Sequence, residues 1–350
     1  MRSITSIMTT VNYVIDNGLV NRLTTQRKWL DSYIPSVVRR IKEQGINVVF
    51  DSESDFDVMH IHIPMTLAYR LSMSNNNGSH KPSIFHGHMT EDTFFVGSKV
   101  KYFIRRWFRS IAQRSDVILC PSVSAAEYYR NILPDADIRQ LNYGIDLDRY
   151  AYSYQERLAF RQRYGIEEDR TVVSCVGGVL QRKGIDDFCD IATRFPDMLF
   201  MWVGGSFYKN RGMNSLYGMI SRENSMDVAK VPENVLFTDY TLDVPAALSA
   251  SDIFFFPSRH ETQGLALVEA AANSRPIVAR DLPVFREWLT HGHDCLVGTN
   301  VDEFTALIRS LANDRELADR IGKEACRSAR KHHDIDRASA SLARIYRELA

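Results

Sequence analysis

Short runs of β-branched and aromatic residues alternate along this chain of 350 residues with longer amphipathic stretches. This alternation is typical of an α/β fold, in which helices connect the parallel strands of a sheet. The strand-like runs are apolar throughout, which indicates sheets covered by helices on both faces. A single hydrophobic core rarely grows beyond about 250–300 residues, so we expect two domains.

The expected elements fall into two series separated by a polar stretch at 145–165. Predicted strands cover residues 46–50, 58–62, 83–86, 117–120, 171–175, 199–203, 234–237, 253–256 and 276–279. Predicted helices cover residues 22–44 (broken near Pro35), 124–132, 185–194 and 264–273. We therefore expect a Rossmann-like domain at 1–150, a second at 151–335, and a terminal helix at 336–350 that packs back on the first.

Several protein classes are excluded by composition. The five cysteines are scattered and form no Cys-x-x-Cys pair, which argues against a disulfide framework or a zinc site and favours a reducing, cytoplasmic location. No apolar run approaches the roughly 18–20 residues that span a bilayer. The first ten residues contain no apolar signal-peptide core.

Two glutamates follow the apolar strand at 253–256. Glu261 lies in a polar loop, and Glu269 lies eight residues later in the helix that opens at Gly264. The N-terminus of a helix after a parallel strand presents backbone N–H groups and partial positive charge, to which phosphates and sugar hydroxyls bind. The alternative is that Glu269 is an ordinary helix residue and Glu261 a solvated loop charge.

Residues 231–289 resemble the core of retaining glycosyltransferase family 4, and the resemblance extends over nearly the whole chain. The resemblance rests on the Glu261-x7-Glu269 motif, on segment 275–281 and on segment 142–146, which is similar to the hinge-side pattern of the family. It implies a GT-B fold, in which two Rossmann-like domains with parallel sheets face each other across a cleft. The runs 86–98 and 281–289 are most similar to those of bacterial enzymes that extend glucosyl-diacylglycerol to a diglycosyl lipid.

The resemblance also implies a donor site for a nucleotide-sugar. Segment 176–184 is similar to the phosphate-contacting loop of the family, so Lys183, helped by Arg182, would neutralise the diphosphate without a metal ion or cofactor. Gly178 stands where many members have arginine, and Arg182 is the candidate to replace it. The alternative for Arg182 and Lys183 is that they lie in a solvated turn and bind no phosphate. The remaining donor-site candidates are Thr262, Gln263, Gly264, Leu265 and Glu269.

Four histidines end two predicted strands of the first half. The resemblance implies that His86 faces the donor sugar, so His86 and Glu261 are the catalytic candidates, and His88 and Gly18 are assigned to the acceptor side. A structural histidine and a metal ligand are the alternatives for His86 and His88, although no third ligand is evident from spacing. His60 and His62 are expected to line the core or the cleft.

Segment 99–114 combines basic and aromatic residues and contains no acidic residue. Such a helix is typical of an interfacial membrane anchor, and residues 1–145 carry 17 basic and 13 acidic residues in a chain of zero net charge. We expect binding to an anionic membrane surface through Lys101, Arg105, Arg106, Trp107 and Arg109. The alternative is a surface helix whose aromatic side chains pack on the domain. No nucleic-acid motif accompanies the segment.

The resulting hypothesis is a retaining hexosyltransferase, peripheral on the cytosolic membrane face. It would move a hexose from a nucleotide-sugar, which we expect to be linked to UDP, to a glycolipid such as a glycosyl-diacylglycerol. One alternative is a family-4 enzyme with a polyprenyl-linked or polysaccharide acceptor. Others are a soluble GT-B enzyme, such as a nucleotide-sugar epimerase, and a sugar-binding relative without activity.

Overall fold

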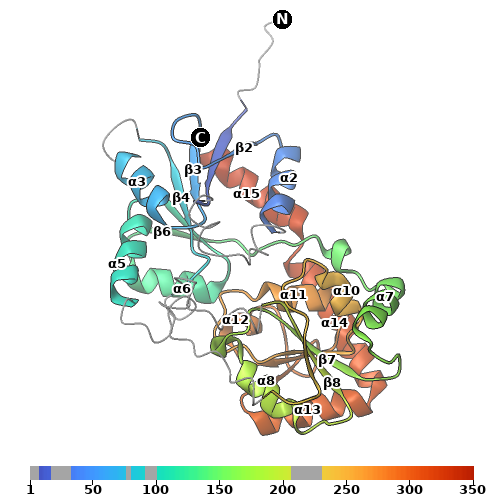
Figure 1. The fold of residues 1–350 in the computed structure, drawn as a ribbon. Helices are drawn as coiled ribbons and strands as arrows, with labels where there is room; N and C mark the ends of the chain where they lie inside the picture. Colours follow the sequence, from blue (N-terminus) through green and yellow to red (C-terminus); the bar gives the residue numbers. More distant parts are fainter. Residues whose placement is uncertain (1–7, 17–32, 76–79, 91–100, 206–230) are drawn as a thin grey trace, which may run out of the picture. The chain divides into compact units, whose positions relative to one another are not determined.

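The computed structural model describes residues 8–16, 33–75, 80–90, 101–205 and 231–350. Contacts divide the chain into two compact units (Figure 1). Unit 1 comprises Met1–Gly144 together with Ile335–Ala350, and unit 2 comprises Ile145–Asp334. The division lies ahead of the expected boundary at 150 because Ile145, Leu147 and Tyr150 are buried in the core of unit 2.

Unit 1 contains a six-stranded parallel sheet in the order β2-β1-β3-β4-β5-β6. The strands are β1 (Thr10–Val14), β2 (Asn47–Phe50), β3 (Val58–Ile61), β4 (Ser83–His86), β5 (Val117–Cys120) and β6 (Asp137–Gln140). Its helices are α2 (Ile34–Glu43), α3 (Thr66–Asn75), α5 (Lys101–Ala112), α6 (Val123–Ile132) and α15 (Ile335–Leu349). Separate apolar clusters on the two faces confirm that helices cover both sides of this sheet.

Helix α15 belongs to unit 1 although its residues follow all of unit 2 in sequence. It packs against α2 (Figure 1). Leu342 and Tyr346 are buried in the same cluster as residues of β1 and β3. The positions are four residues apart, so both side chains lie on the helix face that meets the sheet.

Unit 2 contains a second six-stranded parallel sheet, in the order β12-β11-β10-β7-β8-β9. The strands are β7 (Val172–Val176), β8 (Leu199–Val203), β9 (Val235–Phe237), β10 (Ile253–Phe256), β11 (Ile277–Arg280) and β12 (Leu296–Gly298). The helical segments are η2 (Leu147–Tyr150), α7 (Tyr154–Tyr164), η3 (Gln181–Lys183), α8 (Ile185–Ala192), α10 (Val244–Ser249), α11 (Leu265–Ala272), α12 (Pro283–Arg286), α13 (Val301–Asn313) and α14 (Arg315–His332).

Three strands were not predicted: β1, β6 and β12. Asn12 interrupts the apolar run of β1, and its buried side chain bonds both the carbonyl and the N–H of Ser52. Strands β6 and β12 are edge strands, of which β6 is polar and β12 has only three residues. Helix α2 begins at Ile34, so Pro35 lies in its first turn, where the missing N–H costs nothing; residues 17–32, which include most of the earlier part of the helix expected at 22–44, lie outside the described residues.

Candidate active site

The winding of the unit 2 sheet reverses between β7 and β10. The chain runs from β7 through β8 to β9 on one side, and the later strands β10, β11 and β12 lie on the other. In open parallel sheets, ligands bind beyond the carboxyl ends of the strands at such a reversal. Lys183 follows β7 and Glu261 follows β10, so two predicted site residues come from the two loops at this point.

Lys183 and Glu261 form an ion pair between these loops. The lysine Nζ lies 2.5 Å from Oε1 of Glu261, and the hydroxyl of Ser258 donates to the same oxygen at 2.7 Å. The two charged side chains are only 17% and 10% exposed. Burial lowers the pKa of Lys183, and the carboxylate of Glu261 opposes this shift. An entering anion would therefore compete with Glu261 for an ammonium group that is already largely desolvated.

Two glycines with positive φ allow the loops to approach each other. Gly184 has a φ of 78°, and a Cβ there would lie 2.5 Å from the carbonyl oxygen of Pro257. Gly264 has a φ of 81° and precedes α11, where a Cβ would lie 2.8 Å from the ring of Phe285. Other residues would strain both positions. Within the described chain, no side chain caps α11 and no acidic residue lies in its first turn.

The other predicted donor residues differ in their surroundings. Gln263 is buried, and its side-chain amide bonds Nδ1 of His333 at 3.0 Å. Glu269 is also buried and accepts a hydrogen bond from the hydroxyl of Tyr150 at 2.9 Å. Arg182, Thr262 and Leu265 are half-buried. The assignment of these side chains to the donor remains a prediction, and Gln263 contacts the domain interior.

The group that supports the loop after β10 was not predicted from the sequence. Asp187 accepts hydrogen bonds from Arg280 at 2.5 Å and from Arg259 at 3.0 Å. Arg280 also donates to the carbonyl of Pro257 at 3.0 Å. Arg280 belongs to the segment 275–281 that carries the family resemblance, and that was the available signal. The group fixes the loop on which Ser258 and Glu261 lie.

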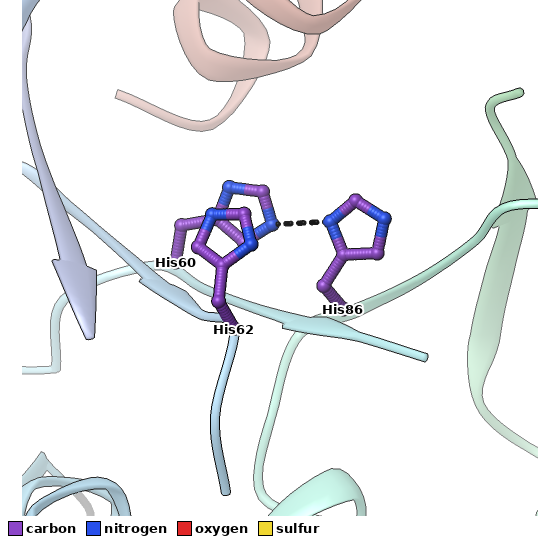
Figure 2. Close-up of side chains that lie close together, drawn as sticks. All are labelled: His60, His62 and His86. Atoms are coloured by element: carbon purple, nitrogen blue, oxygen red, sulfur yellow. Dashed lines mark hydrogen bonds between the residues drawn. The ribbon is translucent and has the colours of Figure 1, made fainter. Parts of the chain in front are cut away.

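The four histidines of unit 1 lie together at the carboxyl ends of β3 and β4. Figure 2 shows three of them, with His60 and His62 projecting from one strand and His86 from the next. His60 Nε2 lies 3.0 Å from His86 Nδ1, and His62 Nδ1 lies 2.9 Å from His88 Nε2. His60, His62 and His86 are buried, as expected for His60 and His62. We call His60, His62, His86 and His88 the histidine cluster.

Burial keeps the histidine cluster neutral. It lowers the pKa of His86 to about 3. The pKa values of His60, His62 and His88 lie well below the usual range because of burial and, secondarily, repulsion between neighbouring imidazoles. The phenols of Tyr346 and Tyr143 bond Nδ1 of His60 and of His88, respectively. Neutral imidazoles offer one donor and one acceptor each, which suits uncharged hydroxyl groups.

His60, His62 and His86 also qualify by position as a candidate metal group, since one ring nitrogen of each lies within 4.8 Å of the others. No third ligand for His86 and His88 was evident in the sequence, because spacing along the chain does not reveal that β3 and β4 are neighbours. The prediction that the protein needs no metal stays a prediction.

Helix α5 exposes most of the residues assigned to a membrane surface. Arg105, Arg106 and Arg109 are exposed. Trp107 is half-buried: its Nε1 donates to the carbonyl of Pro64 at 2.9 Å and its ring stacks on Tyr69, so its assignment to a membrane surface stays a prediction. The exposed aromatic residues of this helix are instead Tyr102 and Phe103, at 64% and 71%.

Two residues that were assigned from the sequence are not fully described in the structure. The side chain of Lys101 and the whole of Gly18 lie outside the described residues. In the parts of the chain that are described, no helix combines the length and the apolarity needed to span a membrane.

The chain is similar in sequence to glycosyltransferases of known function. The chain is 28% identical over 283 residues to the processive diacylglycerol alpha-glucosyltransferase of Acholeplasma laidlawii, covering 79% of this chain and 81% of the relative. It is 23% identical to the alpha-galactosylglucosyldiacylglycerol synthase of Streptococcus pneumoniae, covering 82% and 78%.

The fold resembles that of HepE from Anabaena, solved with UDP and glucose, with a TM-score of 0.75, 15% identity and coverage of 97% and 99%. It also resembles sucrose-phosphate synthase from Thermosynechococcus elongatus, with a TM-score of 0.78, 14% identity and the same coverage. These similarities and the two parallel sheets confirm the GT-B fold.

Two family models match successive parts of the chain. Residues 10–149 match the model described as Glycosyltransferase Family 4, and residues 156–328 match the model described as Glycosyl transferases group 1. Together these matches cover most of both units. The chain therefore belongs to the family-4 glycosyltransferases, enzymes that transfer a sugar and have the GT-B fold.

Proposed function

We propose that this enzyme transfers a hexose from a UDP-sugar to a membrane glycolipid of the glycosyl-diacylglycerol type, with retention of the anomeric configuration. Unit 2 binds the donor and unit 1 binds the acceptor. The observation that carries the donor half is the Lys183–Glu261 pair at the reversal point of the unit 2 sheet.

The chemistry of this pair suits a departing nucleotide diphosphate. Negative charge develops on the leaving phosphate during transfer, and a fixed cation in a partly desolvated site stabilises it more strongly than water does. The diphosphate draws Lys183 from Glu261, and Glu261, still held by Ser258, then accepts hydrogen bonds from sugar hydroxyls. Arg182 adds positive charge, so the proposal needs no metal ion. HepE, whose fold is similar, was solved with UDP and with UDP-glucose.

The acceptor half of the proposal draws on the relatives and on helix α5. Two of the relatives are named for synthesis of glucosylated diacylglycerols, and another for transfer of mannose to a phosphatidylinositol monomannoside. Residues 102, 106 and 109 recur at helical spacing and form one exposed face with Phe103 and Arg105. Aromatic and basic residues on one face suit the interface of an anionic membrane.

The test is a transfer assay with a panel of donors and acceptors. Purified protein receives UDP-glucose, UDP-galactose or GDP-mannose, with vesicles containing phosphatidylglycerol with or without glucosyl-diacylglycerol. Mass spectrometry identifies the product, and NMR gives its anomeric configuration. We expect an α-linked diglycosyl lipid from a UDP-sugar. Transfer to a polyprenyl-linked or polysaccharide acceptor alone, or epimerisation of the free donor, would refute the acceptor assignment, and an inverted product would refute retention.

A further inference from the structure

The histidine cluster is built from two hydrogen-bonded pairs that stack on each other. The rings of His60 and His86 are nearly coplanar, with an angle of 3° between their planes, and those of His62 and His88 differ by 20°. Across the pairs, the centroids of His60 and His62 are 4.0 Å apart, and those of His86 and His88 are 3.9 Å apart. Within each hydrogen-bonded pair, the edge of one ring therefore faces the edge of the other.

One of these pairs continues into the terminal helix α15. The hydroxyl of Tyr346 lies 2.6 Å from Nδ1 of His60, and it donates to the hydroxyl of Tyr13 at 2.9 Å. With the 3.0 Å contact from His60 to His86, this makes a row of four side chains. All four are buried. We call Tyr13, Tyr346, His60 and His86 the hydrogen-bond row.

Each link of the row contains one proton, so the direction of one link sets the next. When the hydroxyl of Tyr346 donates to that of Tyr13, its oxygen accepts from Nδ1–H of His60. Nε2 of a neutral His60 then carries a lone pair, which accepts from Nδ1–H of His86. Nε2 of His86 is left with a lone pair. Among the described residues, this buried atom has no hydrogen-bond partner.

A metal ion fits the same rings less well. Zinc holds its nitrogen ligands at 2.0–2.1 Å in a tetrahedron, which places them about 3.4 Å apart. The rings of His60 and His62 are tilted by 33° with centroids only 4.0 Å apart, so one ring overlaps the other and the two do not meet edge to edge as around a shared ion. The short nitrogen–nitrogen contact between His60 and His86 lies along coplanar rings, as in a hydrogen bond.

We propose that Tyr346 and His60 are positioning residues that hold His86 with its proton on Nδ1, so that Nε2 accepts a hydrogen bond from a hydroxyl of the bound sugar. The consequence for transfer rests on the proposed function and on the expectation, from the family resemblance, that His86 faces the sugar; the tautomer rests on the hydrogen-bond row. Through this contact, Tyr346 of helix α15 controls the tautomer of His86 at the end of β4.

The tautomer is measurable by long-range proton–nitrogen NMR on protein labelled with 15N-histidine, with His86 assigned through His86→Gln. We expect Nδ1–H in the wild type. Tyr346→Phe removes the partner of His60, so His86 should become a mixture of tautomers. Tyr13→Phe leaves Nδ1 of His60 as the remaining acceptor in the row for the Tyr346 proton, so the row should reverse and His86 should carry its proton on Nε2. Tyr129→Phe, a buried tyrosine outside the row that donates to Met89, is the matched control and should change nothing.

Turnover is the second readout. Tyr346→Phe and Tyr13→Phe should lower kcat about ten-fold, the size of one net hydrogen bond, with the KM for donor little changed. One tautomer in all variants, or a wild type protonated on Nε2, overturns the proposal. So does stoichiometric zinc in the purified protein that shifts the ring resonances of His60, His62 and His86. Altered tautomers with unchanged turnover support the positioning and refute the role of His86 in transfer.

Discussion

Both units place their candidate residues beyond the carboxyl ends of strands in a six-stranded parallel sheet, but the side chains there have different chemistry. In unit 2, loops after β7 and β10 bring together the opposite charges of Lys183 and Glu261, which remain partly exposed. In unit 1, β3 and β4 end in the histidine cluster, whose imidazoles are buried and neutral. Topology therefore determines where a site forms, and a few side chains determine whether it suits an anion or an uncharged hydroxyl.

The largest expected difference between the units is in stability toward acid. The histidines of the cluster have pKa values below those of unfolded histidines, near 6.5, so the unfolded state takes up more protons as the pH falls below that value. Lowering the pH from 7 to 5 should remove about 2 kcal/mol of unfolding free energy per histidine. Urea titrations at both pH values measure this loss, and His62→Gln should reduce it.

Hydrogen exchange on the whole protein localises the same effect. Peptides covering β3 and β4 should lose protection at pH 5 before those covering β7 and β10. Equal loss in both sheets would remove the contrast between a neutral and a charged site.

The next largest effect concerns the charged site. Lys183→Ala should lower kcat/KM by about 10²–10³-fold, because one preorganised group that stabilises developing negative charge is lost. Lys323→Ala, at an exposed lysine of α14, is the control and should retain full activity. A Lys183→Ala enzyme with a tenth or more of wild-type activity would mean that the pair does not act on the diphosphate.

Membrane binding tests whether unit 1 meets a charged surface in addition to neutral hydroxyls. Replacing Arg105, Arg106 and Arg109 by Ser should weaken binding to phosphatidylglycerol vesicles by about 3 kcal/mol at low salt, near 1 kcal/mol for each charge. Wild-type binding should fall as salt rises, since the Debye length shortens to about 8 Å at physiological ionic strength. Sedimentation measures both.

The control for this variant is the matched replacement of Arg315, Arg320 and Arg327, which are exposed on α14. It should bind vesicles as the wild type does. If both triple variants lose binding equally, net charge explains the effect and the face of α5 does not.

A smaller effect is expected inside unit 2. Glu269→Gln preserves the shape of a side chain that accepts from Tyr150 but removes its charge. We expect donor affinity to fall by about 1.5–3 kcal/mol, the value of a charge-assisted hydrogen bond. Calorimetry with UDP-glucose measures it, and unchanged affinity would assign Glu269 to the interior of unit 2.

The smallest expected effect is that of chelation. Because Lys183 and Arg182 supply positive charge, activity should be the same in EDTA as in magnesium or manganese. Loss of turnover in EDTA that either metal restores would place a metal ion in one of the two sites, and the charge of that site would then include the ion.

Much of the fold was predictable because buried parallel strands are continuous apolar runs, as at β5, β8 and β10. The strands that were not predicted lack this signal. Strand β6 is polar and lies at an edge of the sheet. Strand β1 contains Asn12, whose hydrogen bonds to Ser52 exist only in the folded chain. Helix α5 was expected at nearly its observed position, but the inward direction of Trp107 depends on the carbonyl of Pro64, which is distant in sequence.

Some contacts of the candidate site were likewise predictable from local sequence, and others were not. Lys183 and Glu261 were named from local motifs, and the structure pairs them. The link between His60 and Tyr346 joins residues 286 positions apart, and no local pattern reports it. Gln263 carries the same motif signal as Glu261 but bonds His333 in the interior, because one residue along a turn changes the direction of a side chain.

Helix α15 also imposes an order on the synthesis of the protein. The ribosome reaches residues 335–349 only after it has translated all of unit 2, although unit 1 needs them to complete its core. At about 5–20 residues per second, the intervening stretch takes about 10–40 s. During that interval the sheet of unit 1 exists without the helix that contributes Tyr346. Unit 2 is continuous in sequence, so it can reach its native state on the ribosome before the unit that was translated first.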